Sequence, residues 1–97
     1  MDLNIIFKRL DNLIEQGWKP CINVLENGLW HCSLMHKDLP PCGYKEKIVN
    51  GVRELRLQDH PLRINIRNQK TMSDAIILAC DIAEIIDVEE AINVKPV

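Results

Sequence analysis

The segment from Thr71 to about Asp87 combines a helix start signal with more apolar surface than one packing partner covers. Thr71-Met-Ser-Asp74 forms a capping box in which aspartate replaces the usual glutamate. At about 100° per residue, the apolar side chains cover an arc of roughly 220°, whereas a helix on one sheet needs about 100°. We therefore expect a C-terminal helix that contributes to the core and keeps an apolar margin. The arc consists of Met72, Ala75, Ile76, Leu78, Ala79, Cys80, Ile82, Ala83, Ile85 and Ile86.

The remaining circumference of this helix is mainly acidic. The apolar margin, whose burial the sequence leaves open, contains Leu78 and Ile85, beside Asp81. In one alternative, a long loop, the C-terminal tail or the first helix covers this margin. In the other, a second copy of the chain or a different protein covers it, so the pattern indicates a protein-binding helix. The acidic positions are Asp74, Asp81, Glu84 and Asp87.

A second helix is predicted at the start of the chain, from about Asp2 to Gln16. Asp2 is suited to the N-cap, and Gly17 stands where a helix often ends in the left-handed conformation. Its apolar side chains form a stripe of only about 120°, typical of a helix buried on one side. The stripe consists of Leu3, Ile6, Phe7, Leu10, Leu13 and Ile14.

A β-hairpin is predicted after the first helix, with strands over 19–25 and 29–35 around the turn signal Asn27-Gly28. A two-residue turn would place the apolar residues of the two strands on opposite faces. A three-residue loop, 26–28, with Gly28 in the left-handed conformation, places them on one face, and we favour it. That face carries Ile22, Val24, Trp30, Cys32 and Leu34, whereas Cys21, Asn23, His31 and Ser33 face away.

The middle of the chain predicts a loop over 36–44, because Pro40-Pro41 interrupts regular structure. The following segment, 45–50, is ambiguous: Asn50-Gly51 either turns a small hairpin or belongs to a loop that leads into a strand over 52–58. After the turn at 59–61, residues 62–67 alternate as a strand. Leu62, Ile64 and Ile66 point inward, and Arg63, Asn65 and Arg67 point outward. The tail, 89–97, is expected to lack regular structure.

This order of elements predicts an α+β fold in one domain spanning residues 1–97. An antiparallel sheet of three to four strands carries the N- and C-terminal helices on one face. The other face, with Arg63, Asn65, Arg67, His31 and Ser33, would be solvated or used for binding.

The net charge of −2 is distributed unevenly along the chain. Residues 1–44 carry −1, residues 45–70 carry +4 and residues 71–97 carry −5. The basic and acidic segments either neutralise each other in the fold or face partners of opposite charge. No apolar run approaches the roughly 18 residues of a membrane span, and the start Met-Asp-Leu-Asn lacks the basic region of a signal peptide. We therefore expect a cytoplasmic protein with no partner in a membrane.

The four cysteines, which include no Cys-x-x-Cys pair, are expected to be free thiols. Cys32-x3-His36-x5-Cys42, with Cys21 or His31 nearby, matches no standard zinc site, and Cys32 belongs to the predicted core. Cys42 with His36 or His60 as base lacks an oxyanion-hole pattern beyond Cys42-Gly43. We expect no metal, no cofactor and no enzymatic activity.

The α-β-β-β-α order resembles the double-stranded RNA-binding domain. That family holds phosphates with a lysine cluster at the start of its last helix, where this chain has Thr71-Met-Ser-Asp-Ala-Ile and no lysine. This departure removes the residues that would carry over the family's function. Nucleic-acid binding through the basic section 45–70 is kept as the alternative function rather than the leading one. Its basic residues are Lys45, Lys47, Arg53, Arg56, Arg63, Arg67 and Lys70.

A broader pattern covers most of the chain as a succession of element types. A first helix ending in Gly17-Trp18, a short hairpin with Trp30, a proline-rich loop and a terminal helix starting Ser73-Asp-Ala-Ile resemble small bacteriophage and prophage proteins. Such proteins often bind one host protein, and they include anti-CRISPR inhibitors of bacterial defence. HicB-type antitoxins also have a sheet followed by a helix that begins Thr-x-x-Glu-Ala, which Thr71 to Ala75 resemble. They lack the first helix of this chain.

The resemblance implies a phage-encoded inhibitor that occludes a site on a host defence protein or protein–nucleic-acid complex, in the host cytoplasm. The residue patterns predict a non-enzymatic protein-binding module, with association into a homodimer through the last helix as an alternative. A third hypothesis treats the acidic end as a mimic of nucleic-acid phosphates. The candidate partner-binding residues are Ile77, Leu78, Asp81, Glu84 and Ile85 on the helix and Arg56, Arg63 and Arg67 on the sheet.

Overall fold

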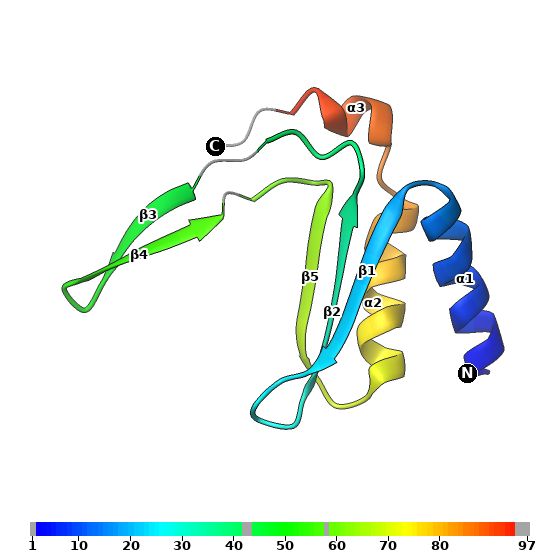
Figure 1. The fold of residues 1–97 in the computed structure, drawn as a ribbon. Helices are drawn as coiled ribbons and strands as arrows, with labels where there is room; N and C mark the ends of the chain where they lie inside the picture. Colours follow the sequence, from blue (N-terminus) through cyan, green and yellow to red (C-terminus); the bar gives the residue numbers. More distant parts are fainter. Residues whose placement is uncertain (1, 42–43, 58, 95–97) are drawn as a thin grey trace.

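A computed structural model describes residues 2–41, 44–57 and 59–94 and shows an α+β fold with helices at both ends (Figure 1). Three strands form the main antiparallel sheet, in the order β1-β2-β5, and two more form a separate hairpin, β3-β4. The fold class predicted from the sequence is confirmed. The elements are α1 (Leu3–Glu15), β1 (Trp18–Val24), β2 (Trp30–His36), β3 (Tyr44–Val49), β4 (Val52–Leu57), β5 (Arg63–Gln69), α2 (Met72–Glu84) and α3 (Val88–Ile92).

Helix α1 begins and ends at the predicted signals. The Asp2 carboxylate accepts a hydrogen bond from the backbone N–H of Asn4 at 2.9 Å, and Gly17 follows the helix with φ +105°. Only the centre of the predicted apolar stripe is buried. Ile6, Leu10 and Leu13 lie in the core, whereas Leu3, Phe7 and Ile14 are exposed.

The β1-β2 hairpin has the register that the three-residue loop requires. Val24 lies opposite Trp30, and the backbone N–H of Leu25 donates to the carbonyl of Leu29 at 2.7 Å. Gly28 has φ +79°, which is the left-handed conformation predicted for it. The prediction is confirmed, and it puts Cys32 on the buried face of the sheet.

Strand β5 pairs antiparallel with β2 and carries the predicted alternation. Leu62 and Ile64 are buried on the side of the helices. The register shifts between the pairs Cys32–Ile66 and Trp30–Gln69, where β5 contains one extra residue. Asn68 adopts φ +62° within this bulge, just before the chain enters α2.

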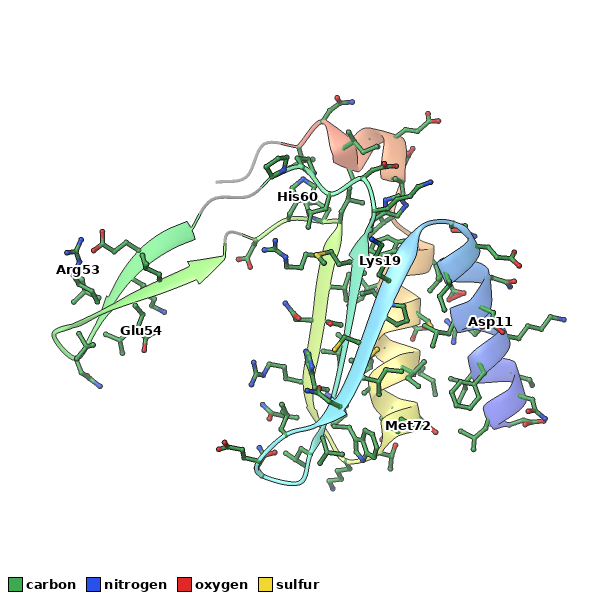
Figure 2. The ribbon with its side chains drawn as sticks, in the orientation of Figure 1. Asp11, Lys19, Arg53, Glu54, His60 and Met72 are labelled. Carbon is green, nitrogen blue, oxygen red and sulfur yellow. The ribbon has the colours of Figure 1, made fainter. Side chains whose placement is uncertain are left out.

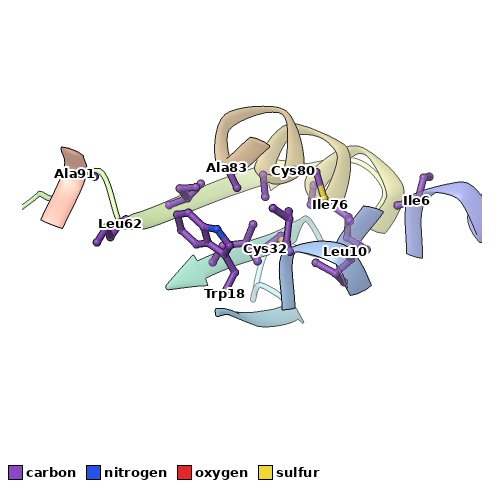
Figure 3. Close-up of a cluster of buried hydrophobic side chains, with 14 residues drawn as sticks. Ile6, Leu10, Trp18, Cys32, Leu62, Ile76, Cys80, Ala83 and Ala91 are labelled. Carbon is purple, nitrogen blue, oxygen red and sulfur yellow. The ribbon is translucent and has the colours of Figure 1, made fainter. Parts of the chain in front are cut away.

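Both terminal helices lie on the same face of the main sheet, with α2 behind β2 and β5 and α1 beside it next to β1 (Figure 1). The small side chains of Ala75, Ala79 and Ala83 allow α2 to approach the sheet closely. Figure 3 shows the resulting core between the helices and the sheet. Its largest fully buried side chains are Trp18, Ile6, Leu13, Leu34, Leu62, Ile76, Cys32 and Cys80.

The C-terminal helix is shorter than predicted, and the tail is not irregular throughout. Helix α2 ends at Glu84, and the Asp87 carboxylate accepts from the backbone N–H of Glu90 at 3.2 Å, which starts the separate helix α3. Asp87 and Glu90 have the spacing of a second capping box. Ala91 is buried against the core, so apolar packing holds α3 in place.

Two buried histidines connect the loops at the end of the sheet. In His36 and His60, Nδ1 accepts from the backbone N–H two residues further along, at 3.1 and 3.0 Å. Nε2 donates to a distant carbonyl, that of Gln16 at 2.8 Å and that of Val94 at 3.0 Å respectively. Each ring therefore joins two segments of the backbone through both of its nitrogens.

Candidate protein-interaction site

Residues 44–57, which we call the arm, form a two-stranded hairpin that projects from the body of the protein (Figure 1). Asn50 and Gly51 have φ +51° and +79°, as a two-residue type I′ turn requires, and Val49 lies opposite Val52. The small hairpin is thus the correct one of the two alternatives for this segment. It is not a fourth strand of the main sheet, however, because β3 and β4 pair only with each other.

The arm has almost no packing partner among the described helices and strands. Strands β3 and β4 contact each other and make no substantial contact with another described helix or strand. An isolated two-stranded hairpin is only marginally stable in water. The radius of gyration, 14.8 Å, exceeds the roughly 12–13 Å expected for a compact chain of this length, which agrees with a projecting arm.

Large apolar side chains are exposed along the arm. Ile48 and Leu55 are each 71% exposed and Val52 is 63% exposed. The register places Ile48 opposite Arg53 and Leu55 opposite Glu46, so these four residues share one face, and Val52 lies on the other. Exposed side chains of this size on an unsupported hairpin mark a surface that a partner would bury.

An ion pair accompanies the two apolar side chains on that face. The Arg53 guanidinium donates to the Glu46 carboxylate across the two strands. Arg53 and Glu54 extend to opposite sides of the arm (Figure 2), as the alternation of a strand requires. The face with Ile48 and Leu55, which we call the arm face, therefore combines exposed aliphatic side chains with an ion pair.

A second exposed apolar surface lies on α2. Leu78, Ile82 and Ile85 are 40%, 41% and 84% exposed and follow one another at helical spacing, which gives one stripe on the helix. We call it the helix stripe. The margin predicted from the sequence, Leu78 and Ile85, is thus uncovered by the described part of the chain, and Ile82 extends it.

The acidic candidates Asp81 and Glu84 bind α1. Nη2 of Arg9 donates to Oδ1 of Asp81 at 2.6 Å, and its Nε lies 3.1 and 3.2 Å from the two carboxylate oxygens of Glu84. These hydrogen bonds, chiefly those to Glu84, raise the pKa of Arg9 above its ordinary value. The two carboxylates therefore hold α1 against α2, although the Asp81 side chain also remains more than half exposed.

The remaining helix candidate, Ile77, is separate from the helix stripe. It is half-buried and packs against the core. At about 100° per residue, Ile77 lies about 100° from Leu78 around the helix, on the same side as Glu84. The five helix candidates therefore divide into an exposed stripe, a pair of carboxylates bound to Arg9 and one residue that contributes to packing.

The arginine candidates do not form one surface. Arg63 and Arg67 lie on the face of β5 that points away from the helices, whereas Arg56 lies on the arm, where its backbone pairs with Lys45. The open face of the main sheet has no acidic residue at its outward positions in the three strands. These positions are Lys19, Cys21, Asn23, His31, Ser33, Met35, Arg63, Asn65 and Arg67.

Hydrogen bonds across all three strands order this open face. Nδ1 of His31 lies 2.8 Å from Oδ1 of Asn23, and its Nε2 lies 3.4 Å from Oδ1 of Asn65. The face is positively charged through Lys19, Arg63 and Arg67. Its outward positions include no Phe, Tyr or Trp on which a base would stack.

The cysteines described by the structure are not arranged for catalysis or metal binding. Burial raises the pKa of Cys32 to about 11, and it also raises that of Cys80, so both remain protonated thiols in the core. Cys21 is exposed on the open sheet face. Among the described residues no three His, Cys, Asp or Glu side chains gather into a metal site. Cys42 lies outside the described residues, so the zinc and nucleophile hypotheses that include it stay untested.

Comparisons with protein-family models, with curated proteins and with solved structures find no match to this chain. In the part of the chain that the structure describes, no helix has the length and apolar character needed to cross a membrane.

Proposed function

We propose that this chain is a non-enzymatic protein-binding module whose principal binding element is the arm. One observation carries the proposal: Ile48 and Leu55 are each 71% exposed on a hairpin that packs against no other described element. A hairpin of this size gains stability when a partner covers one face. Binding and ordering of the arm would therefore reinforce each other.

Burial of the arm face would contribute measurably to the affinity of a complex. Burying a large aliphatic side chain contributes about 1.5–3 kcal/mol, and most of this remains to be gained at Ile48 and Leu55. The two side chains together supply about 3 kcal/mol, which corresponds to roughly 100-fold in the dissociation constant. The Glu46–Arg53 pair beside them adds orientation more than affinity.

The class of partner follows from the resemblance of the chain to small phage proteins. On that basis the partner is a bacterial defence protein or protein–nucleic-acid complex, and the module acts as an inhibitor in the host cytoplasm. The arm would occlude a site on the partner through direct contact. The carboxylates of Asp81 and Glu84 already bind Arg9, which weakens the hypothesis that the acidic end mimics nucleic-acid phosphates.

An affinity capture from bacterial lysate with three immobilised proteins tests this function. The arm variant carries Ile48→Ala and Leu55→Ala, and the matched control carries Ile5→Ala and Ile14→Ala at two exposed positions of α1. We expect wild type and control to retain the same partner and the arm variant to lose at least about 30-fold in affinity. Equal capture by the arm variant, with its melting temperature unchanged, would contradict the role of the arm.

Nucleic-acid binding remains a second candidate because the open sheet face gathers Lys19, Arg63 and Arg67 without an acidic residue among its outward positions. A phosphate binder of this kind would retain duplex RNA or DNA at low salt and lose it on Arg63→Glu with Arg67→Glu. A mobility-shift titration with wild type that shows no retention at low salt removes this candidate. The arm variant should behave like wild type in this assay.

A further inference from the structure

Strand β5 leaves one edge of the main sheet open. It stands at the end of the order β1-β2-β5, and no other described strand pairs with its outer side (Figure 1). The backbone N–H of His36 in β2 donates to the carbonyl of Leu62 at 2.9 Å. Because residues alternate along a strand, Ile64 also directs its backbone groups to β2, and Asn65 directs its groups to the outer side. An extended segment can pair with these outward groups.

The opposite edge of the sheet, formed by β1, is less suited to such pairing. By the same alternation, Ser33 of β2 and Cys21 of β1 exchange their backbone hydrogen bonds, so Pro20 points its backbone outward. Proline has no N–H to donate, and within sheets it is found where that side of an edge strand faces solvent. Residues 63–69 of β5 include no proline. Of the two edges, the β5 edge is therefore the one that accepts an added strand.

Two side chains of the helix stripe lie beside this edge. At about 100° per residue, Leu78 and Ile82 lie about 100° and 60° around α2 from Ala79, which is fully buried. They lie in the direction away from Glu84, which binds Arg9 of α1. Since α1 is on the β1 side of α2, this direction leads past β5. A strand added beside β5 would therefore cover Leu78 and Ile82, which are 40% and 41% exposed.

The spacing of these two side chains matches that of an added strand. Strand β5 and helix α2 follow each other through a short turn and run in opposite directions. Three residues of strand span about 10 Å, which equals the rise of about seven residues of helix. Counting from the turn, Ile66 then lies level with Leu78, and Ile64 lies level with Ile82. Inward side chains of an added strand are about 7 Å apart, and Leu78 and Ile82 are separated by about 6 Å of helix rise.

The outward side chains along the edge favour an acidic occupant. Arg63 and Arg67 flank Asn65 on the open face, and none of the outward positions of the three strands is acidic. A second copy that paired through the same edge, with Asn65 facing Asn65, would place Arg63 of one copy beside Arg67 of the other. Like charges side by side oppose that pairing. Acidic residues at alternate positions of the added strand place opposite charges side by side instead.

We propose that the β5 edge binds an extended segment of a partner protein in which acidic and aliphatic residues alternate. The segment adds a fourth strand to the main sheet. Its acidic side chains lie beside Arg63 and Arg67, and its aliphatic side chains cover Leu78 and Ile82. Backbone hydrogen bonds supply affinity, and the two sets of side chains supply selectivity. The edge is separate from the arm, so it binds this segment independently of the function proposed for the arm.

Titration of the full chain with two synthetic peptides, followed by two-dimensional NMR, tests this site. The probe consists of four Glu-Val repeats with blocked ends, and the matched control consists of four Lys-Val repeats. We expect the Glu-Val peptide to bind with a dissociation constant below about 1 mM and the Lys-Val peptide to bind at least 10-fold more weakly. The amide of Asn65 should become protected from hydrogen exchange in the complex, because it donates to the added strand.

Three variants test the two sets of side chains. Ile82→Ser should weaken binding of the Glu-Val peptide at least about 5-fold, whereas Ile5→Ser, at an exposed aliphatic position of α1, should bind it like wild type. Arg67→Glu should reverse the preference, so that the Lys-Val peptide binds more tightly than the Glu-Val peptide. A loss of stability alone does not reverse a preference. Circular dichroism confirms that each variant is folded, and Leu78→Ser replaces Ile82→Ser if that variant is not.

Four outcomes would overturn the proposal. The first is no binding of the Glu-Val peptide up to about 1 mM, and the second is equal affinity for the two peptides. The third is a set of shifted signals confined to 44–57, which would move strand addition to the arm. The fourth is retention of duplex RNA or DNA without binding of the Glu-Val peptide, which would assign the open face to nucleic acid. Loss of the arm's partner in the lysate capture changes none of these readouts, so the two proposals fail separately.

Discussion

Replacing Trp18 with alanine is expected to lower the free energy of unfolding by about 3–5 kcal/mol. Trp18 is 1% exposed and is among the largest fully buried side chains of the core. Its ring lies edge-on to His36, with centroids 5.2 Å apart and an interplanar angle of 82°. The substitution therefore removes a large apolar group and leaves a cavity where α1, β1 and β2 meet.

The matched control is Trp30→Ala, in the same hairpin but only half-buried. Its expected cost is about 1–2 kcal/mol, since part of that side chain already contacts water. Urea denaturation followed by circular dichroism compares the two variants without relying on tryptophan fluorescence. Equal losses at the two positions, or a loss below about 1 kcal/mol at Trp18, would contradict the core as described.

Gly17→Ala is expected to cost about 2–3 kcal/mol for two reasons that act together. The backbone at Gly17 has φ +105°, which a residue with a Cβ rarely adopts. A Cβ at this position would also lie 2.9 Å from Nε2 of His36, which is fixed by its hydrogen bond to the carbonyl of Gln16. The substitution therefore strains the backbone and displaces a buried histidine.

Gly28→Ala separates the two contributions. Gly28 has φ +79°, but a Cβ there would meet nothing within 4 Å. We expect about 1 kcal/mol for this variant, from backbone strain alone. Thermal or urea denaturation measures both variants. If Gly17→Ala lowers the free energy of unfolding no more than Gly28→Ala does, that result would contradict the close packing of His36 on the end of α1.

The sequence was most informative where structure is decided locally. Asp2 and Thr71 predicted helix starts because their side-chain oxygens satisfy backbone N–H groups within the same turn. The register of the β1-β2 hairpin followed from one requirement, that Trp30 and Cys32 share a face with Ile22. Local hydrogen bonding and side-chain alternation are sufficient for such elements.

The sequence was less informative about which elements pack together. Asn50-Gly51 indicated a hairpin, but no local pattern tells whether its strands join the main sheet or project from it. That choice depends on packing between segments distant in sequence, and in the structure β3 and β4 pair only with each other. The exposure of Ile48 and Leu55 was therefore not predicted, and Arg56 was the one arm residue among the candidate partner-binding residues.

The candidate binding residues were also predicted only in part, because contacts between distant segments decide their surroundings. The width of the apolar arc left open whether the chain covers Leu78 and Ile85, and the described part of the chain leaves both exposed. It did not indicate that Arg9, from the other end of the chain, binds Asp81 and Glu84. The end of α2 was also misplaced, because Asp87 was assigned to the helix when it caps the next one.

The arm packs against no other described helix or strand, and we propose that a partner outside the chain stabilises it. Amide hydrogen exchange of dilute, partner-free protein measures this most directly. We predict that amides of 44–57 exchange within about ten-fold of the unstructured rate, while those of β2 are protected close to the global stability. Arm amides protected as strongly as those of β2 in the same sample would contradict the account.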